Sequence, residues 1–430
     1  MKTLIKNVTA LIRKGDGKYV TRVTDIRIDG DTIVSVSKSN ASFVPDKVID
    51  GTNKLAIPGL INAHTHAYMT CFRGLADDLP FSEWLFERIM PNEDRLTDED
   101  AYEASLAGCL EMLKSGTTCY LDMHMFKGMS AKASIDTGIR CVLSRGLVGS
   151  GDDEAGTTRL AQAFDEMETF SSCPALSFAL APHAIYTTDA DFLKKVASLA
   201  KKHSLPVHIH LSESVNEVEE CRAKTGMTPV EYLDSLGFFE NRVIAAHCAN
   251  LTDNDIRILA ERKVNVVLCV RSNMKLGNGI PSIKKLHDVG VNLCLGTDSA
   301  GSNNTLNLFA EIAAVSLISK GVERSPVCIT APQVLDMATY NAAQALGLDS
   351  GVIAKGKKAD IALLDLESPA FVPANDLVSS LCYSANGSEV DTVIVGGNTV
   401  VENGRLLSMD EKEIIKRVSK IIPRLKERMK

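Results

Sequence analysis

The sequence has few histidines, one tryptophan and no apolar run long enough to cross a bilayer. Its 430 residues include nine histidines, and the formal net charge is -7. No block of basic residues occurs, so the chain offers nucleic acid or an anionic membrane surface little to bind. These absences argue against a nucleic-acid-binding or membrane-spanning protein, and they favour a small molecule as the partner.

Cysteine usage and the first residues both suggest an intracellular protein. The eleven cysteines are scattered, odd in number and never spaced as CxxC, so we expect reduced, mostly buried thiols. In the opening stretch MKTLIKNVTALIRK, Lys6 and Asn7 interrupt the apolar residues before the core of a signal peptide can form. We therefore expect a cytoplasmic protein, with one large domain and one smaller domain.

Both ends of the chain are rich in predicted strands. The segment VTDIRIDGDTIVSVS alternates apolar and polar residues on either side of Asp29-Gly30, which predicts a tight hairpin. Near the other end, KKADIALLDL and VDTVIVGGNTVVENGRLL are strand-like runs separated by glycine turns. We expect residues 1–57 and 348–430 to form a small β-sandwich domain. The last 21 residues have helical spacing and are predicted to lie on the surface.

The region between these ends alternates short apolar runs with amphipathic helices. Eight runs occur in order: GLINAH, TTCYLDM, RCVLSRG, LSFALAPH, PVHIHL, VIAAHC, VNVVLCV and VNLCLGTD. Eight β-α alternations over residues 58–347 fit a parallel (β/α)8 barrel better than an open doubly wound sheet. In such a barrel the chemistry takes place at the C-terminal ends of the strands.

Two of the intervening helices have clear start and stop signals. Thr97 is placed to cap a helix that Gly116 ends. Thr330 and Gln333 have the spacing of a capping box, ahead of a predicted helix that closes at Gly347.

Five residues that can bind metal or transfer protons end the predicted strands. His64 and His66 end the first run, His210 the fifth, His247 the sixth and Asp298 the eighth. An isolated His-x-His is weak evidence, and Asp298 alone could be a helix cap. In a barrel, however, these residues converge on one rim, and residues i and i+2 of a strand point the same way.

Three imidazoles and one carboxylate form a ligand set for a borderline-soft divalent ion, most simply zinc, with a position left for water. A metal held in this way makes water a nucleophile near neutral pH, which predicts hydrolysis. Glu213, three residues past His210, is suited to carry a proton between water and leaving group. His247 is either a further ligand or a hydrogen-bonding group for the nucleophile and the developing oxyanion. We expect His208 to be a hydrogen-bonded residue of the barrel interior.

Several longer strings resemble the amidohydrolase superfamily, in particular its methylthioadenosine/S-adenosylhomocysteine deaminase branch. The strings are PGLINAHTHAYMTCFRGLADDLPFSEWL, HIHLSES, AAHCANLT, SNMKLGNG and LGTDSAGSNNTLNLF. The resemblance implies one metal ion held by His64, His66, His210 and Asp298, with zinc expected and iron, manganese or nickel as alternatives. No lysine ends the fourth run, where relatives with two metals keep a bridging carbamate, and this supports a single ion.

The resemblance also implies a mechanism. Activated water would attack the purine carbon that bears the amino group. Asp298 would accept a proton from the water, Glu213 would protonate the adjacent ring nitrogen, and ammonia would leave. The substrate would be an adenosine-type nucleoside thioether, and the enzyme is expected to be a homo-oligomer.

Substrate-binding residues also carry over from the resemblance. Glu93 matches the glutamate that binds the ribose hydroxyls in relatives, and His183 matches a histidine that contacts the purine or its sugar. Arg145 and Arg159 match a pair that meets the carboxylate of the homocysteine tail. An arginine fork suits a carboxylate, although a surface ion pair is the alternative for each.

Two departures from the pattern lie beside the predicted pocket. The run Leu268–Arg271 stands where relatives have a histidine, a small polar residue and a proline. His124 stands where an aromatic residue is common. A guanine, pterin or triazine hydrolase therefore remains an alternative, as does a metal-free interaction scaffold, although every predicted ligand and Glu213 are present.

Overall fold

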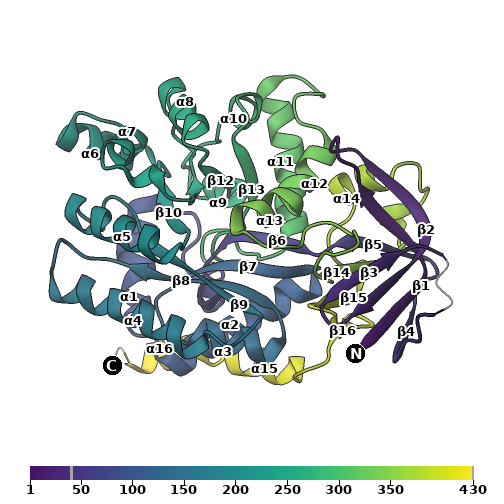
Figure 1. The fold of residues 1–430 in the computed structure, drawn as a ribbon. Helices are drawn as coiled ribbons and strands as arrows, with labels where there is room; N and C mark the ends of the chain where they lie inside the picture. Colours follow the sequence, from purple (N-terminus) through teal and green to yellow (C-terminus); the bar gives the residue numbers. More distant parts are fainter. Residues whose placement is uncertain (39–41, 429–430) are drawn as a thin grey trace.

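The computed structural model describes residues 1–38 and 42–428, and its centre is an eight-stranded parallel barrel (Figure 1). Its strands are β6 (Leu60–Thr65), β7 (Thr117–His124), β8 (Arg140–Leu147), β9 (Leu176–Pro182), β10 (Val207–Leu211), β11 (Val243–His247), β12 (Asn265–Leu268) and β13 (Asn292–Leu295). Each neighbouring pair is parallel and hydrogen-bonded, from β6 through to β13. Each strand falls within or almost within one of the eight runs, so the prediction of a (β/α)8 barrel is confirmed.

The barrel closes at the residues that were predicted to bind metal. An isolated parallel bridge joins Thr65 to Asp298, and the Asp298 amide donates to the His64 carbonyl at 3.0 Å. The first and last strands therefore meet at their C-terminal ends. The closure itself brings His64 next to Asp298, although 234 positions separate them in the sequence.

Helices surround the barrel, and most have side-chain caps at their N-termini. The α-helices of the central region are α1 (Met90–Glu93), α2 (Asp98–Lys114), α3 (Met129–Thr137), α4 (Glu154–Phe170), α5 (Ala190–His203), α6 (Val215–Thr225), α7 (Pro229–Ser235), α8 (Asp253–Glu261), α9 (Val270–Lys275), α10 (Ile283–Asp288), α11 (Leu308–Glu323), α12 (Ala331–Met337) and α13 (Tyr340–Leu346). Short non-α turns are η1 (Ala67–Phe72), η2 (Glu83–Ile89), η3 (Phe238–Glu240) and η4 (Pro369–Phe371). Thr97 caps α2 through a capping box with Asp100, which confirms the predicted start.

The helix predicted from Thr330 to Gly347 is two helices, so its continuity was wrong. The capping box of Thr330 and Gln333 is present, and Gly347 caps the end. Between them Thr339 has φ -136° and ψ -88°, outside the helical region. The Ala338 carbonyl accepts the amide of Ile61 in the first barrel strand at 2.9 Å. That tertiary hydrogen bond removes the carbonyl from the helical ladder, which a local sequence signal could not reveal.

Side chains of modest size fill the barrel interior, where a separate apolar cluster lies. The cluster includes Ile61, Ala63, Cys119, Leu121, Val142, Ala179, Ile244, Val267, Cys269 and Cys294. All eleven cysteines are free and ten are buried, as their scattered spacing predicted. A larger apolar core, separate from the cluster inside the barrel, lies between the strands and the surrounding helices.

The two chain ends form one mixed sheet, which lies to the right of the barrel in Figure 1. Its strands are β1 (Lys2–Arg13), β2 (Tyr19–Asp29), β3 (Thr32–Val36), β4 (Lys47–Asp50), β5 (Lys54–Pro58), β14 (Ile361–Asp365), β15 (Val390–Val395), β16 (Asn398–Glu402) and β17 (Arg405–Leu406). The order is β17-β16-β15-β14-β5-β1-β2-β3, with β4 paired to β1. The prediction that both ends build a separate β-rich unit is confirmed, and β5 joins β14 directly.

This sheet packs at the N-terminal end of the barrel strands. Arg140, the first residue of β8, forms a 3.2 Å ion pair with Asp360, and the Asp360 carbonyl accepts the Gly59 amide just before β6. The C-terminal ends of the barrel strands are therefore left for the functional site.

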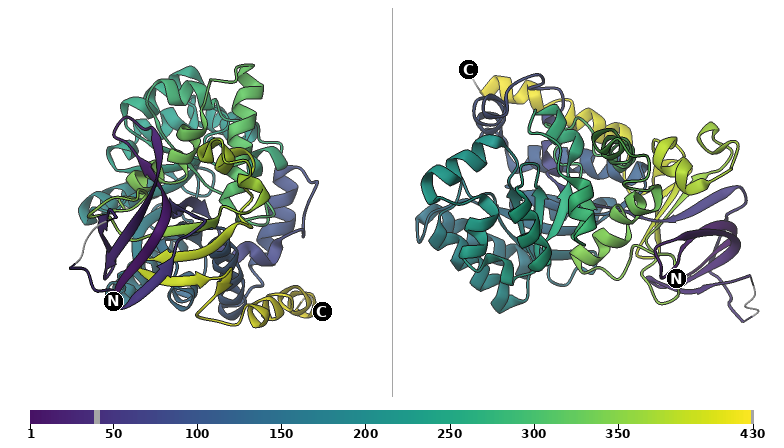
Figure 2. Two further views of the ribbon diagram at one scale, coloured as in Figure 1. Left: turned by 90° about the vertical axis from the view of Figure 1, so that its right-hand side faces the viewer. Right: turned by 90° about the horizontal axis from the view of Figure 1, so that it is seen from above.

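The last helices, α15 (Glu411–Val418) and α16 (Ile421–Arg428), run along the outside of the barrel (Figure 2). They expose their polar side chains, bury Ile414, Ile421 and Leu425, and pair with α2 of the barrel. The end of this predicted surface segment, residues 429–430, lies outside the described part. Among the helices within residues 1–38 and 42–428, none is long and apolar enough for a membrane span.

Candidate metal centre

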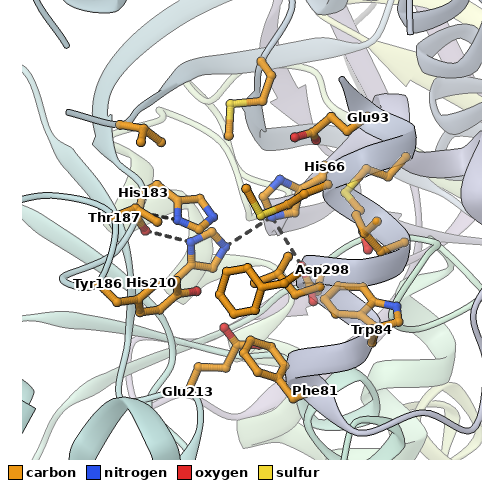
Figure 3. A pocket seen from close by; sticks show the side chains of 18 of the residues that line it. His66, Phe81, Trp84, Glu93, His183, Tyr186, Thr187, His210, Glu213 and Asp298 are labelled. Carbon is orange, nitrogen blue, oxygen red and sulfur yellow. Dashed lines mark hydrogen bonds and ion pairs between the residues drawn. The ribbon is translucent and has the colours of Figure 1, made fainter. Parts of the chain in front are cut away.

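A deep cavity opens at the C-terminal ends of the barrel strands (Figure 3), and we call it the reaction cavity. It is lined by His66, Tyr68, Met69, Phe81, Trp84, Leu85, Phe86, Ile89, Met90, Glu93, Met125, Val148, His183, Tyr186, Thr187, His210, Glu213, His247, Asp298 and Ser299. His66, His210, His247 and Asp298, which were predicted at the ends of four different strands, thus meet at one place.

A chain of hydrogen bonds fixes which nitrogen of His64 faces the site. The Ser144 hydroxyl donates to the Asp122 carbonyl at 2.8 Å, so it accepts from His208 Nδ1 at 2.9 Å. His208 Nε2 then accepts from His64 Nδ1 at 2.8 Å. His64 Nε2 is left without a hydrogen and without a hydrogen-bond partner. His208 is therefore a hydrogen-bonded interior residue, as predicted.

His66 and His210 are oriented in the same way, each by a backbone carbonyl. His66 Nδ1 donates to Met123 O at 2.7 Å, and His210 Nδ1 donates to His183 O at 2.8 Å. Their Nε2 atoms face each other at 3.2 Å. With each Nδ1 proton donated to a carbonyl, the two Nε2 atoms face each other, and a cation placed between them would accept a lone pair from each.

Asp298 completes the cluster with one free carboxylate oxygen. Oδ2 accepts the hydroxyls of Ser272 and Ser302, each at 2.6 Å. Oδ1 lies 3.2 Å from His64 Nε2 and 3.4 Å from His66 Nε2. The two hydroxyl groups that donate to Oδ2 favour the ionised form of the carboxyl. The group is therefore a carboxylate that presents one oxygen to the imidazoles.

The imidazoles are in the form that binds metal. Burial lowers the pKa of His64 to about 4 and holds that of His210 well below its usual value. Neutral rings with bare Nε2 atoms beside a carboxylate oxygen are the donor set of a zinc site. The residues present therefore fit a divalent ion.

Five side chains compete for the coordination positions. One ligand atom each from His64, His210, His247 and Asp298 lies within 4.8 Å of the others. His66 falls outside that group, although its Nε2 is close to His210 and Asp298. All four predicted ligands and His247 are thus brought together, and the geometry does not by itself decide between His66 and His247.

His247 is held by an amide and by a strained backbone. Its Nδ1 lies 2.8 Å from Asn273 Oδ1, and its Nε2 has no hydrogen-bond partner. Its φ of 73° is in the left-handed region, which costs a non-glycine residue about 1 to 3 kcal/mol. Burial lowers the pKa of His247, but the carboxylates of Glu213 and Asp298 more than offset this and raise it. The ring can therefore donate a hydrogen bond from Nε2 into the cavity.

Glu213 is buried and lines the same cavity. Its Oε2 lies 3.7 Å from His247 Nε2, and its Oε1 accepts from Asn278 Nδ2 at 3.3 Å. Burial raises the pKa of this carboxyl to about 7. Glu217 accepts the backbone amide of Glu213 at 2.7 Å and so fixes the turn after β10. The carboxyl can both give and take a proton near neutral pH.

One short segment contacts three of these groups in order along the chain. Ser272 bonds Asp298, Asn273 bonds His247, and Asn278 bonds Glu213. Sequence reasoning did not assign roles to these three residues, because hydroxyl and amide side chains are common in loops. Their position inside the string SNMKLGNG was the available signal.

The predicted nucleoside-binding residues Glu93 and His183 also line the reaction cavity. Tyr68 donates its hydroxyl to Glu93 Oε1, and burial raises the pKa of this glutamate. Burial lowers the pKa of His183 to about 3, and its Nδ1 lies 3.1 Å from the Thr187 hydroxyl. Thr187 donates to Ala184 O, so it accepts from His183, whose Nε2 remains an acceptor.

The predicted tail-binding arginines lie outside the reaction cavity lining. Arg145 is 7% exposed, and it donates to Met125 O at 2.8 Å and to Gln162 Oε1 at 2.5 Å. Arg159 Nη1 lies 3.6 Å from Met125 Sδ. Both arginines therefore contact Met125, a residue that does line the cavity.

The two departures from the family pattern also lie outside that lining. Arg271 donates from Nε to Asn303 Oδ1 at 2.9 Å and lies 3.8 Å from Glu311. His124 forms a buried 3.1 Å contact with Glu166. The added cation of Arg271 thus contacts Asn303 and Glu311 and does not line the reaction cavity.

Comparison with known proteins places this geometry in a family. Residues 55–400 match the amidohydrolase family. The 5'-deoxyadenosine deaminase of Methanocaldococcus jannaschii is 42% identical over 92% of this chain and 95% of its own length. The 5-methylthioadenosine/S-adenosylhomocysteine deaminase of Dictyoglomus thermophilum is 43% identical over 96% of this chain and 97% of its own.

A solved structure agrees with these sequence matches. An adenosine deaminase from Xanthomonas campestris with bound zinc has a TM-score of 0.94, at 31% identity, over 99% of this chain and 98% of its own. The chain belongs to the amidohydrolase family.

Proposed function

We propose that this protein is a zinc-dependent hydrolase that removes the amino group from an adenosine-type nucleoside and releases ammonia and the inosine-type product. The observation that carries the proposal is the convergence of the Nε2 atoms of His64 and His66 on Oδ1 of Asp298, with His210 Nε2 3.2 Å from that of His66. Relatives above 40% identity over almost the whole chain are named deaminases of 5'-deoxyadenosine or of methylthioadenosine and S-adenosylhomocysteine, which supports the same reaction.

The metal ligands in this proposal are His64, His66, His210 and Asp298. When bound, a divalent ion makes water a competent nucleophile near neutral pH. His247 donates from Nε2 to the attacking oxygen when its ring is protonated, because Asn273 Oδ1 accepts from its Nδ1 and the neighbouring carboxylates raise its pKa. Bare imidazole nitrogens and a buried carboxylate explain the choice of zinc, and the zinc-bound deaminase of similar structure supports it.

Two carboxyl groups move the protons. Asp298 is held as a carboxylate, so it can accept a proton from the attacking water through Oδ1. Glu213 gives its proton to the ring nitrogen next to the carbon that bears the amino group, since its raised pKa keeps much of it protonated near pH 7. The ammonia that leaves takes the first proton of the water from Asp298, and the second proton returns to Glu213 as the carbonyl group forms, so both carboxyl groups regain their starting states. The sum is substrate and water giving product and ammonia.

The remaining cavity residues hold the nucleoside. Glu93, kept in place by the Tyr68 hydroxyl, accepts from the ribose hydroxyls. His183 Nε2 accepts a further hydrogen bond from the nucleoside, because its other nitrogen is used by Thr187. Phe81 and Trp84 provide an aromatic wall, with ring centroids 6.0 Å apart, against which a base can lie.

The test is ammonia release by the zinc-loaded protein from adenosine, 5'-deoxyadenosine, methylthioadenosine, S-adenosylhomocysteine and guanine, together with chloride release from a chlorinated triazine. The proposal expects turnover of the adenosine compounds at least 100-fold faster than of guanine, and no dechlorination of the triazine. Faster turnover of guanine or the triazine would replace the substrate class. A protein that binds no zinc and releases no ammonia would support the scaffold alternative.

Four further expectations remain proposals. We propose that the protein works in the cytoplasm, forms a homo-oligomer and binds no nucleic acid. Light scattering tests the oligomeric state, and a gel-shift assay tests the binding of nucleic acid. We also propose the domain limits 1–57 with 348–430 and 58–347. The C-terminal helices α15 and α16 belong to the proposed small domain but contact α2 of the barrel. The boundary between residues 347 and 348 therefore needs a direct test, which is limited proteolysis followed by sequencing of the fragments.

A further inference from the structure

A second cavity lies beside the reaction cavity, and we call it the arginine cavity. It has a volume of about 490 Å³. It is lined by Asp98, Met125, Phe126, Lys127, Gly128, Arg145, Gln162, Thr169 and Phe170. Among the described residues, Met125 is the one that lines both cavities. This methionine is therefore the shared wall between them.

Met125 is held in place from three directions. Its carbonyl accepts from Arg145 Nη1 at 2.8 Å, and its sulfur lies 3.6 Å from Arg159 Nη1. Behind it is Gly146, where a Cβ atom would come within 2.8 Å of both Met125 Cε and Sδ. The absence of a side chain at Gly146 thus provides the space that the methionine side chain fills.

The two cavities differ in chemistry. The apolar lining of the reaction cavity includes Ile89, Met90 and Val148 as well as Met125. The arginine cavity contains Arg145, which is 93% buried and whose Nε has no hydrogen-bond partner. It also contains the carboxylate of Asp98, so groups of both signs line one space. Such a space suits a zwitterionic amino-acid group, with its carboxylate on the guanidinium and its ammonium near the aspartate.

The lining of the reaction cavity relates Met125 to its sugar end. Arg159 Nη1 lies 3.6 Å from Met125 Sδ, and Met125 lines the same cavity as Glu93. If Glu93 holds the ribose hydroxyls, as proposed above, the 5' substituent of the nucleoside lies near Met125.

We propose that Met125 determines which 5' substituents this enzyme accepts. The inference depends on the proposed deaminase function and goes beyond it. With Met125 in the wall, the reaction cavity accepts short, uncharged 5' groups, such as a methyl or a methylthio group. A 5' substituent that ends in an amino-acid carboxylate reaches Arg145 only when the methionine side chain leaves the wall. Methionine has three rotatable bonds, so the wall hinders the long substituent but does not exclude it.

The experiment compares kcat/KM for methylthioadenosine and S-adenosylhomocysteine in zinc-loaded wild type and Met125→Ala. Wild type is expected to favour methylthioadenosine by at least 10-fold. The substitution is expected to reduce that ratio by at least 10-fold, because it opens the wall to the arginine cavity. Met227→Ala is the matched control, since this exposed methionine lies between α6 and α7, outside both cavities, and its ratio is expected to equal that of wild type.

Arg145→Ala distinguishes a barrier at Met125 from a merely structural role of this residue, because only a barrier makes the ratio of the two kcat/KM values depend on Arg145. In the wild-type background this change is expected to alter the ratio less than 2-fold. In the Met125→Ala background it is expected to remove most of the gained activity on S-adenosylhomocysteine. If Met125→Ala does not fold, Met125→Val is used in the same series, and thermal unfolding identifies folding defects.

Each outcome is distinguishable. If both nucleosides release ammonia but the ratio does not respond to substitution of Met125, the inference is wrong and the proposed function stands. If wild type has the same kcat/KM for S-adenosylhomocysteine and for methylthioadenosine, Met125 is not a barrier. If no adenosine compound releases ammonia, the proposed function fails and the inference falls with it.

Discussion

The hydroxyl of Ser272 donates a 2.6 Å hydrogen bond to Oδ2 of Asp298. This bond, with that of Ser302, occupies the oxygen that faces away from His64 and His66, so the carboxylate cannot rotate without losing a partner. The orientation of a metal-ligating group is often set by such outer contacts.

Replacement of Ser272 by alanine is expected to weaken zinc binding by about 10- to 100-fold, because Asp298 loses one of its two fixing hydrogen bonds. The dissociation constant is measured by competition with a chromogenic chelator. Ser319→Ala removes another buried hydroxyl, which bonds a helix carbonyl in α11, and should leave zinc affinity unchanged. Equal zinc affinity in Ser272→Ala and wild type would show that Asp298 does not depend on this bond.

Glu213→Gln and His210→Ala should separate proton transfer from metal binding. The glutamine keeps the shape of Glu213 but cannot protonate a ring nitrogen, so kcat should fall at least 100-fold with zinc content unchanged. His210→Ala removes one Nε2 ligand and should lose zinc and activity together. Zinc is measured by elemental analysis, and turnover by ammonia release. Normal turnover by Glu213→Gln would refute its assignment as the proton donor.

Gly296→Ala tests how tightly the barrel closure holds His64. A Cβ atom at Gly296 would come within 2.7 Å of Val267 Cγ1 and 2.9 Å of His64 Cβ. We expect lower zinc content and a destabilisation of about 1 to 3 kcal/mol, because an overpacked core must shift. Gly321→Ala is the control, since nothing lies within 4 Å of its added methyl group and it is in a helix. Full zinc content in Gly296→Ala would show that the closure tolerates displacement.

Acid should weaken the attachment of the C-terminal helix to the barrel. Asp100 contacts Arg424 at 2.7 Å and Arg428 at 2.5 Å. Burial acts to raise the pKa of Asp100, but the hydrogen bonds from Arg428 and Thr97 hold it below its usual value. A carboxyl with a lowered folded-state pKa stabilises the protein above its ordinary pKa, near 3.9, and this contribution is lost as pH falls through the lower value.

The Asp100→Asn variant should therefore be less stable than wild type by about 1 to 3 kcal/mol at pH 6, and the difference should shrink below about pH 4. Thermal unfolding of both proteins from pH 3 to pH 7 measures it. Asp191→Asn, at a side chain 82% exposed, should show little change at any pH. A difference that grows with falling pH would have the wrong sign for this account.

Much of the fold could be predicted because its signals are local. Each barrel strand is an apolar run with a clear end, and Thr97 marks the start of α2 by a side-chain cap. The split at Thr339 could not be predicted, because it depends on a hydrogen bond between Ile61 and Ala338. Secondary structure that is fixed by a distant partner leaves no local pattern.

In the candidate site, too, some residues could be predicted from local sequence signals, whereas others depend on distant partners. The imidazoles and Asp298 were found because they end apolar strands, where polar residues need a reason. Ser272 and Asn273 were not assigned roles, since their hydrogen bonds depend on rotamers and tertiary placement. The positions of Arg145 and Arg159 beside Met125 also needed coordinates, because the sequence does not show which wall of a cavity a side chain forms.

X-ray absorption at the zinc edge of the zinc-loaded protein tests the central claim most directly. The account predicts one ion per chain, with nitrogen and oxygen ligands at about 2.0 to 2.2 Å and the scattering pattern of at least three imidazoles. His210→Ala should lose that pattern. A spectrum with sulfur at about 2.3 Å, from cysteines such as Cys248 or Cys269, would contradict it, as would a protein that retains no zinc after loading.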